Sequence, residues 1–335
     1  MSEPGVNKTL SGFPSAARYE GDIDYATISV KTWQPASTFS DGTPPRAILQ
    51  LNHGMVEYID RYEAFARAAT NSGFLVVGMD FIGHGDSAPD ALQLGHTGRL
   101  LADGGNVLLR DMDTLRHRTQ QTWPDVPYFM FGHSMGSFVL RAYLAQHGAG
   151  LGGAIICGTG TVPAGQVGAA KVVLGLLGLF HKPDYHSPFF KKLTLGSYNG
   201  AFEKAAGGAR TEFDWLSRDD AQVDAYIADP RCGGTFSLAA NRVLIDVFQR
   251  ANAPSAYSTT PTDLPLLIIS GARDPVGGNG AGVRAVADAY RAAGVTDVTC
   301  ELYPEARHEI LNETNRLDVM ADILNWMNAR ITDDR

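Results

Sequence analysis

Short apolar runs bounded by turn residues alternate with longer amphipathic stretches along most of the chain. Some runs, such as Leu266-Leu267-Ile268-Ile269, contain no polar position, which is typical of strands covered on both faces in a parallel sheet. The runs predict strands at residues 26–33, 47–51, 75–79, 128–131, 153–157, 266–270 and 298–303.

The amphipathic stretches carry apolar residues at three-to-four spacing, the pattern of helices with one buried face. They predict helices at residues 61–69, 106–122, 137–146, 236–250, 283–293 and 316–331. Strands alternating with helices indicate an α/β fold with a mostly parallel central sheet flanked by helices. The residues before Ser15 are expected to form a loose terminal arm.

One long stretch, between Cys157 and Leu264, interrupts this alternation and has little strand character. Residues 160–234 are interpreted as a helical cap insertion over the carboxyl edge of the sheet, where ligands bind in open α/β sheets. The core then comprises residues 1–159 and 235–335. An ordinary pair of crossover helices is the alternative, although such connections are usually much shorter.

Composition and charge narrow the classes of protein. Apolar residues make up 44% and charged residues 19% of the chain, enough to bury a large core. The formal charge of -8, without a basic run, argues against nucleic acid as a partner. The three cysteines, Cys157, Cys232 and Cys300, lie far apart, so we expect a reducing compartment and no disulfide framework or zinc ribbon. The chain starts without a recognisable secretory signal, so a cytoplasmic location is expected.

The run Gly132-His133-Ser134-Met135-Gly136 lies between a predicted strand and a predicted helix. A serine at such a turn adopts a strained backbone with its hydroxyl above the sheet, and side chains in place of the glycines would collide with neighbouring elements. Ser134 is therefore the candidate nucleophile. A glycine-rich turn with an idle serine is the alternative.

A serine hydroxyl needs a general base and an acid that orients the base. In hydrolases with this turn the acid and then the histidine follow the serine, each in a loop after a late strand. Asp274 follows the strand at 266–270, and His308, the only one of nine histidines beyond it, follows the strand at 298–303. The alternative for Asp274 is a surface turn residue. His133 is expected to be a packed residue.

The loop after the strand at 47–51 is the candidate source of an oxyanion donor. The amide of Met135 begins the helix after the nucleophile, where the dipole also favours an anion. We expect the second donor to be the amide of Met55, because Gly54 lets the backbone turn this amide inward. His53 and His84 lie in nearby turns, where hydrogen bonding to loop backbone is the expected role.

Four motifs together resemble the monoacylglycerol lipase and lysophospholipase group of α/β-hydrolases, which is also grouped with the serine aminopeptidases (S33). The motifs are His53-Gly54-x-x-Glu57-x-x-x-Arg61-Tyr62, Asp80-x-x-Gly83-His84-Gly85-x-Ser87, Gly132-His133-Ser134-Met135-Gly136 and Tyr303-x-x-x-Arg307-His308-Glu309-x-x-Asn312-Glu313. The resemblance covers most of the chain and is weakest in the predicted cap. It implies the same nucleophile, acid, base and oxyanion donors as the residues themselves. Met55 stands where the mammalian enzymes of this group commonly have a small residue, and this departure puts the substrate in question rather than the mechanism.

The apolar run at 169–180 is too short to span a membrane, which takes about 20 residues. It is interpreted either as a lid helix that contacts an acyl chain or a membrane or micelle, or as a helix that packs on the core. In the first case Leu174, Leu177 and Phe180 are candidate substrate contacts.

The sequence thus predicts a serine hydrolase that cleaves carboxylic esters with a single acyl chain, monoacylglycerols or related esters being favoured. Four alternatives stay open: a lysophospholipase, a hydrolase-fold protein that binds a ligand without turnover, a cofactor-free haloperoxidase-like enzyme, and an aminopeptidase. For the aminopeptidase, Glu57, Asp219 and Asp220 are candidate amine anchors. No metal or cofactor is expected, because there is no HExxH zinc motif, P-loop or dinucleotide fingerprint. The oligomeric state is left open.

Overall fold

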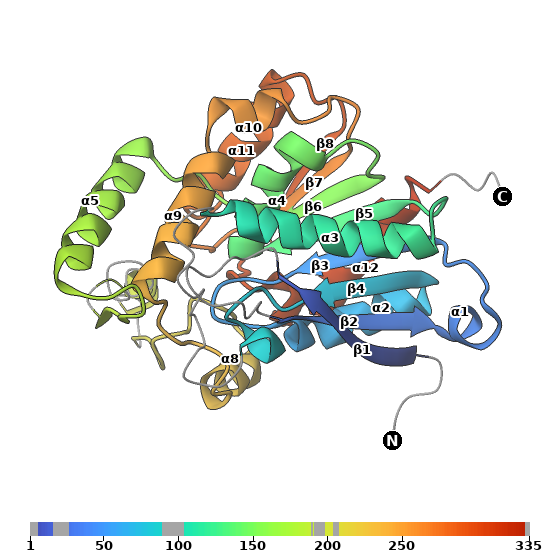
Figure 1. The fold of residues 1–335 in the computed structure, drawn as a ribbon, viewed down its shortest axis with the longest axis horizontal. Coiled ribbons are helices and arrows are strands. Elements are labelled where there is room, and N and C mark those ends of the chain that lie inside the picture. The colour runs from blue at the N-terminus through green and yellow to red at the C-terminus, as the bar shows by residue number, and fades with distance from the viewer. Residues whose placement is uncertain are drawn as a thin grey trace.

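The computed structural model describes residues 6–15, 27–88, 104–188, 190, 198–203 and 208–331. Its centre is an eight-stranded sheet with the strand order β1-β2-β4-β3-β5-β6-β7-β8, flanked by helices (Figure 1). Strands β3 to β8 run parallel, whereas β1 and β2 pair antiparallel with their neighbours. The predicted α/β architecture is confirmed.

The strands lie close to the predicted positions, and residue 26 of the first predicted strand falls outside the described residues. They are β1 (Val6–Pro14), β2 (Thr27–Pro35), β3 (Ala47–Asn52), β4 (Phe74–Met79), β5 (Tyr128–His133), β6 (Gly153–Cys157), β7 (Leu266–Gly271) and β8 (Val298–Tyr303).

The described helices include all six that the spacing predicts, with ends shifted by up to three residues. They are α1 (Ala36–Asp41), α2 (Glu63–Asn71), α3 (Asn106–Thr122), α4 (Met135–His147), α5 (Ala164–Phe180), α7 (Gly200–Glu203), α8 (Asp220–Ala228), α9 (Leu238–Ala251), α10 (Pro254–Ser258), α11 (Ala281–Ala292) and α12 (Arg316–Asn328). None of the helices among the described residues has the length and apolarity needed to cross a membrane.

Two hydrophobic cores explain the continuous apolar runs of the central strands. Successive side chains of a strand point to opposite faces. On β7, Leu266 and Ile268 therefore pack into the core shared with α3, α4 and α11, whereas Leu267 and Ile269 pack into the core shared with α2 and α12. Both faces of the sheet are covered, as the absence of polar alternation predicted.

The prediction of a loose arm before Ser15 is wrong for residues 6–14, which form the edge strand β1 on β2, and residues 1–5 lie outside the described residues. Four of its nine residues are polar, so it lacks the continuous apolar run of the central strands. It is held by Phe13, which is 3% exposed, and by Lys8, which pairs with Asp60 at 2.5 Å and Glu63 at 2.9 Å.

The carboxyl ends of the parallel strands lie at one edge of the sheet, to the left in Figure 1. The chain between β6 and α9 contains α5 and α8, and both helices lie at this side of the molecule (Figure 1). Residues far apart in sequence that follow the central strands therefore meet beneath this segment.

Replacement of Ile268 by alanine tests the two-sided burial of β7. The side chain is fully buried, so Ile268→Ala should lower the free energy of unfolding by about 3 kcal/mol through lost transfer energy and a cavity. Leu317, which is 75% exposed on α12, supplies the control, and Leu317→Ala should change stability by less than about 0.5 kcal/mol. Urea denaturation measures both, and equal effects would contradict the assigned core.

Candidate active site

Ser134 lies at the turn between β5 and α4 with φ of 52° and ψ of -121°. A positive φ is unfavourable for a residue with a side chain and persists only where its surroundings enforce it. Here the amide of Ser134 donates to the carbonyl of Cys157 at 3.0 Å, and the Ser134 carbonyl accepts from the amide and hydroxyl of Ser137 at 2.9 and 2.6 Å. These bonds hold the predicted strand-to-helix turn, the nucleophile elbow, in place.

The two glycines of the elbow are required by close backbone contacts. A Cβ at Gly132 would overlap the carbonyl of Gly136, and a Cβ at Gly136 would overlap the carbonyls of Asn52 and His53. The first turn of α4 therefore lies against the loop after β3, which carries Met55.

Asp274 and His308 form a buried pair at the carboxyl ends of β7 and β8. Asp274 Oδ1 lies 2.9 Å from His308 Nδ1, and the two side chains are 0% and 2% exposed. The other carboxylate oxygen accepts from Ser270 Oγ at 2.7 Å, and Oδ1 also accepts from the Val276 amide at 2.9 Å. Burial alone would raise the pKa of Asp274, but the charge of His308 and these hydrogen bonds lower it, so the group stays ionised.

A cavity of about 910 Å³ brings the predicted site residues together. Ser134, His308, Met55 and Met135 line it, and Asp274 lies behind His308. Most other lining residues are apolar or aromatic, among them Phe138, Val162, Val167, Val173, Phe190, Tyr198, Phe213, Trp215, Tyr226, Leu244, Ile245 and Phe248.

The loop that carries His308 is attached to the segment between β6 and α9. The amide of His308 donates to the carbonyl of Trp215 at 3.3 Å, and the amide of Glu309 donates to the carbonyl of Leu216 at 2.8 Å. The rings of Trp215 and His308 lie 5.0 Å apart. This segment therefore sets the position of the histidine as well as the wall of the cavity.

A buried charge network around Glu57 was not recognised from the sequence. The carboxylate of Glu57 accepts from the Gly54 amide at 2.6 Å, from Tyr62 Oη at 2.8 Å and from Arg61 at 2.6 Å. Arg61 also donates two hydrogen bonds, of 2.6 and 2.7 Å, to Glu309, the residue after His308. The network thus ties the loop of Met55 to the loop of His308. The only available signal was the spacing of Glu57 and Arg61, because Glu309 is far away in sequence.

His133 extends this network to the Asp274–His308 pair. Its Nδ1 lies 3.3 Å from Glu57 Oε1, and its ring lies 4.7 Å from the ring of His308. Burial alone would lower the pKa of His133, but the hydrogen bond and charge of Glu57 raise it. For Glu57, burial alone would raise the pKa, but His133 and Arg61 lower it far below its ordinary range. His133 is buried, as the sequence predicted.

His53 and His84 bind loop backbone, as expected. His53 Nε2 accepts from the Phe81 amide at 2.9 Å, so its Nδ1 carries the proton and donates to the Gly54 carbonyl at 2.7 Å. His84 Nδ1 lies 3.1 Å from the carbonyl of Ile82. Burial lowers the pKa of His53 to about 4 and that of His84 to about 3, so both rings are neutral at pH 7.

The three proposed acyl contacts of α5 lie away from the cavity lining. Leu174 is 1% exposed and packs against Leu238 and Ile245 of α9, Leu177 lies partly buried in the same cluster, and Phe180 is 82% exposed. One position along a helix turns the side chain by about 100°, so neighbouring positions point in different directions. The described α5 residues that line the cavity are Gln166, Val167, Ala169, Ala170 and Val173. Among the residues described, no cluster of His, Cys, Asp and Glu is arranged to hold a metal ion.

Glu57→Gln tests the charge network. The variant keeps an acceptor for Gly54, but it leaves His133 without its carboxylate and leaves Arg61 paired with Glu309 alone, so it should lose about 3 kcal/mol of stability at pH 7. Because the pKa of Glu57 is lower in the folded than in the unfolded protein, its contribution is present at neutral pH and is lost as the pH falls. The difference between the wild type and Glu57→Gln should therefore narrow below about pH 4.

Urea denaturation between pH 7 and pH 3 measures this difference. The exposed residue Glu212 supplies the control, and Glu212→Gln should leave stability unchanged throughout. A stability difference that is independent of pH would contradict an ionised Glu57.

Comparison with known proteins agrees with this geometry. The model of the family described as serine aminopeptidase, S33, matches residues 43–315. A monoacylglycerol lipase of Mycolicibacterium smegmatis is 28% identical, over 85% of this chain and 89% of its own. The monoglyceride lipase of Mus musculus is 24% identical, over 92% of this chain and 89% of its own. A carboxyl esterase from Bacillus coagulans superimposes with a TM-score of 0.85 at 30% identity, over 97% of this chain and 99% of its own. The chain therefore belongs to the serine aminopeptidase S33 family of α/β-hydrolases.

Proposed function

We propose that the protein is a serine hydrolase that cleaves carboxylic esters carrying one acyl chain. The observation that carries this proposal is the Asp274–His308 pair beside the Ser134 elbow, at the wall of a largely apolar cavity of about 910 Å³. Cavities of this size enclose most of the surface of a small organic ligand.

The proposed mechanism proceeds through an acyl-enzyme. His308 takes the proton of Ser134 as the hydroxyl oxygen attacks the ester carbonyl, and Asp274 orients the imidazole and stabilises its cation. The amides of Met55 and Met135 bind the oxyanion, and the N-terminus of α4 adds its dipole. His308 then protonates the leaving alcohol, and a water molecule activated by His308 hydrolyses the acyl-enzyme.

Monoacylglycerols are the favoured substrates. The relatives from Mycolicibacterium smegmatis and Mus musculus are named monoacylglycerol and monoglyceride lipases, and the apolar wall of the cavity suits a single acyl chain. A lysophospholipase would use the same site with a different head group.

An aminopeptidase is less well supported, because the candidate amine anchors already have partners. Glu57 binds Arg61, and Asp219 caps α8 and pairs with Arg316 at 2.8 Å. Asp220 is 74% exposed and lies 3.4 Å from Arg210. None of the three presents an unpaired carboxylate beside Ser134.

Residues 160–234 are proposed to act as a cap on a core of residues 1–159 and 235–335. The proposal is supported by the position of α5 and α8 at the carboxyl edge of the sheet and by the residues that this segment contributes to the cavity wall, such as Val173 and Trp215. Residues 189, 191–197 and 204–207 of the proposed cap lie outside the described residues.

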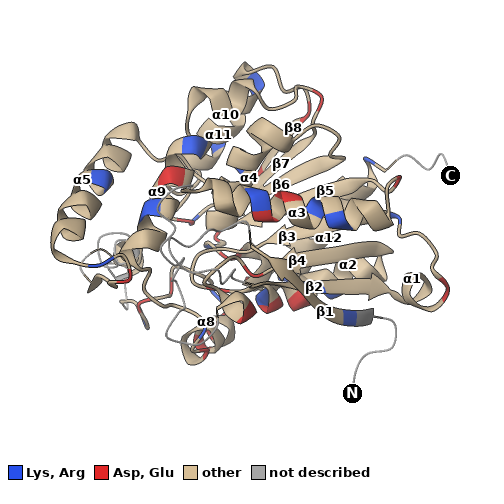
Figure 2. Cartoon of the chain, viewed as in Figure 1, with Lys and Arg blue, Asp and Glu red and all other residues tan. Residues whose placement is uncertain are grey.

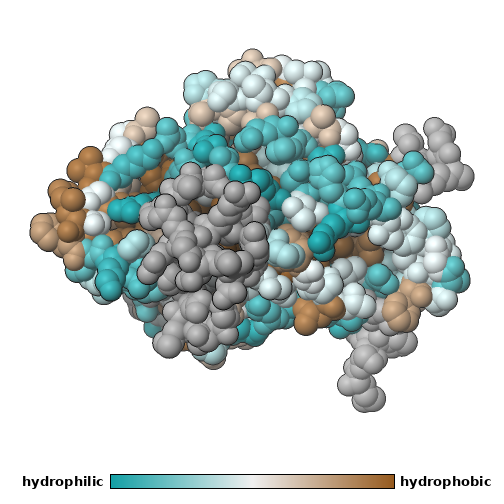
Figure 3. All heavy atoms as spheres, viewed as in Figure 1, coloured by the Kyte–Doolittle hydropathy of each residue, from teal (hydrophilic) through white to brown (hydrophobic). Residues whose placement is uncertain are grey.

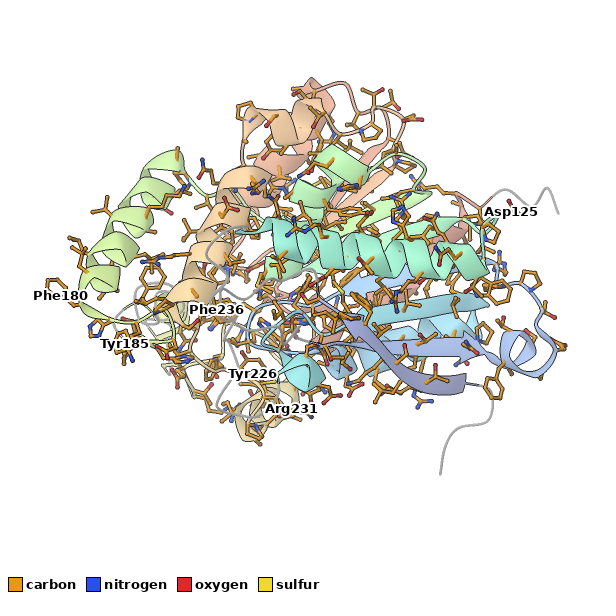
Figure 4. The ribbon with its side chains drawn as sticks, in the orientation of Figure 1. Asp125, Phe180, Tyr185, Tyr226, Arg231 and Phe236 are labelled. Carbon is orange, nitrogen blue, oxygen red and sulfur yellow. The ribbon has the colours of Figure 1, made fainter. Side chains whose placement is uncertain are left out.

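The outer face of α5 is proposed to touch a membrane or micelle transiently. Val172, Leu176, Leu179 and Phe180 are 55–82% exposed and lie on one side of the helix. Figure 3 shows this apolar surface at the left end of the molecule, and Figure 4 shows Phe180 pointing outward. Lys171 is the only charged residue in the sequence of α5, and Figure 2 draws most of this helix as uncharged. Such a surface suits the interface of the lipid that holds the substrate.

The triad is tested by single substitutions. Ser134→Ala and His308→Ala should each lower kcat for a p-nitrophenyl ester by about 10⁵-fold or more, because either change removes the acylation step. Asp274→Asn should lower kcat by about 10⁴-fold, because the amide favours the wrong tautomer of His308. Initial rates across a range of ester concentrations measure these effects.

A fluorophosphonate probe identifies the nucleophile independently. Intact mass should show one adduct in the wild type and in Ser255→Ala, an exposed control, and no adduct in Ser134→Ala. If the wild type binds an ester without turnover and forms no adduct, the protein is a binding protein and the proposed function is wrong.

Leu179→Asp combined with Phe180→Asp tests the lipid contact of α5. The double variant should bind vesicles at least about tenfold more weakly, because it removes exposed apolar area and adds two charges. Its rate on a water-soluble short ester should not change. Leu10→Asp, at a 67% exposed position on β1, is the control, and cosedimentation measures binding. Equal vesicle binding by the wild type and the double variant would contradict the contact.

A further inference from the structure

Arg141 is a fully buried cation about two helical turns beyond Ser134 on α4. A buried charge is costly unless hydrogen bonds and opposite charge compensate it. The hydrogen bonds described for Arg141 all run to neutral oxygen atoms, and its guanidinium also lies 5.4 Å and 5.5 Å from the ring centroids of Phe138 and Tyr257. The role of Arg141 follows from the segments that its guanidinium joins.

The guanidinium of Arg141 joins two segments that are distant in sequence. On one side it donates to the carbonyl of Gly160 at 2.8 Å and to Thr159 Oγ1 at 3.2 Å. On the other side it donates to the carbonyl of Ala251 at 2.7 Å and lies 3.4 Å from Asn252 Oδ1. A further hydrogen bond, of 2.6 Å, runs to Tyr257 Oη.

The two segments are the start and the end of the stretch of chain from β6 to the end of α9, which contains α5 and α8. The chain leaves the sheet after β6 through residues 159–160 and returns at the end of α9, whose last residue is Ala251. The carbonyls at a helix C-terminus carry partial negative charge, so the end of α9 compensates the charge of Arg141 in place of a carboxylate. Arg141 therefore connects residues 159–160, where the chain leaves the sheet, to the C-terminal end of α9.

The apolar wall of the cavity lies directly beyond these contacts. Thr161 and Val162 follow Gly160 and line the cavity, and Phe248 lines it one turn before the end of α9. The amide of Val162 donates to Asn252 Oδ1 at 3.2 Å, the same atom that faces Arg141. Arg141 itself is not among the lining residues.

We propose that Arg141 is a positioning residue that determines acyl-chain specificity, because it fixes the spacing between residues 161–162 and the end of α9. This proposal rests on the proposed ester hydrolysis. The reacting groups are held by other contacts, namely the Ser134 elbow and the Asp274–His308 pair. Loss of Arg141 should therefore alter the fit of the acyl chain more than the chemical step.

Arg141→Met tests the proposal in a series of p-nitrophenyl esters from butyrate to dodecanoate. Methionine fills much of the same volume but cannot join the two segments. The rate on the shortest ester should stay within about threefold of the wild type, whereas the preference for the best-fitting chain over butyrate should fall by about tenfold, mainly through KM. Arg141→Lys should also reduce the preference for the best-fitting chain over butyrate, because a lysine lacks the planar guanidinium that binds two partners at once.

Arg116 supplies the matched control. It is another buried arginine, on α3, that donates to the backbone carbonyls of His147 and Ala149 at 2.6 and 2.8 Å, at the other end of α4. None of these residues lines the cavity. Arg116→Met should lower Tm but leave the chain-length profile unchanged, which separates a specific effect from general destabilisation.

Asn252→Ala keeps the proposal testable if Arg141→Met does not fold. It removes only the side chain that links Val162 to the Arg141 contacts. It should also reduce the preference for the best-fitting chain over butyrate, by a smaller factor than Arg141→Met. Folded Arg141→Met or Asn252→Ala with the profile of the wild type would overturn the inference while leaving ester hydrolysis intact. A wild type without a fluorophosphonate adduct would overturn the proposed function and the inference with it.

Discussion

A Cβ on Gly136 would overlap the carbonyls of Asn52 and His53, so the first turn of α4 lies against the loop after β3 with no space between them. This contact sets the distance between Ser134, which precedes the turn, and Met55, which belongs to the loop. Gly54 is equally constrained, because a Cβ there would overlap the Glu57 carboxylate and crowd the side chain of Ser134. Ser134 and the two amides proposed as oxyanion donors are thus arranged by backbone packing rather than by flexible side chains.

Buried charges support this arrangement in two different ways. Glu57, Arg61, Glu309 and His133 compensate one another with opposite charge and connect the two loops on either side of Ser134. Arg141 is instead compensated by neutral carbonyls, including one at the end of a helix. A buried group whose partner is removed keeps the cost of desolvation without the compensation, which makes both arrangements sensitive to single substitutions.

The sequence was most informative where the determinants are local. Apolar runs without alternation located the central strands, and the glycines around Ser134 marked the elbow, because both signals reside in a few consecutive residues. Chain order then indicated Asp274 and His308, and the structure places these two 2.9 Å apart.

The features that were missed depend on contacts between distant residues or on helical phase. The pairing of Arg61 with Glu309 spans 248 positions, and β1 pairs with β2 although its sequence lacks a continuous apolar run. For α5, the apolar run was visible, but it is apolar on most sides, so the sequence did not reveal that Val173 rather than Leu174 faces the cavity. Packing against α9 decides that orientation.

The hydrogen bonds from His308 and Glu309 to the backbone of Trp215 and Leu216 have a consequence for redesign by domain exchange. The loop that carries His308 is held by hydrogen bonds to the main chain of this segment. A segment grafted from another hydrolase must therefore reproduce the backbone path of residues 215–216. Length and sequence are freer around α5, whose outer face is exposed to solvent. A chimera that exchanges only the α5 region would therefore preserve the backbone path to which the loop of His308 is bonded.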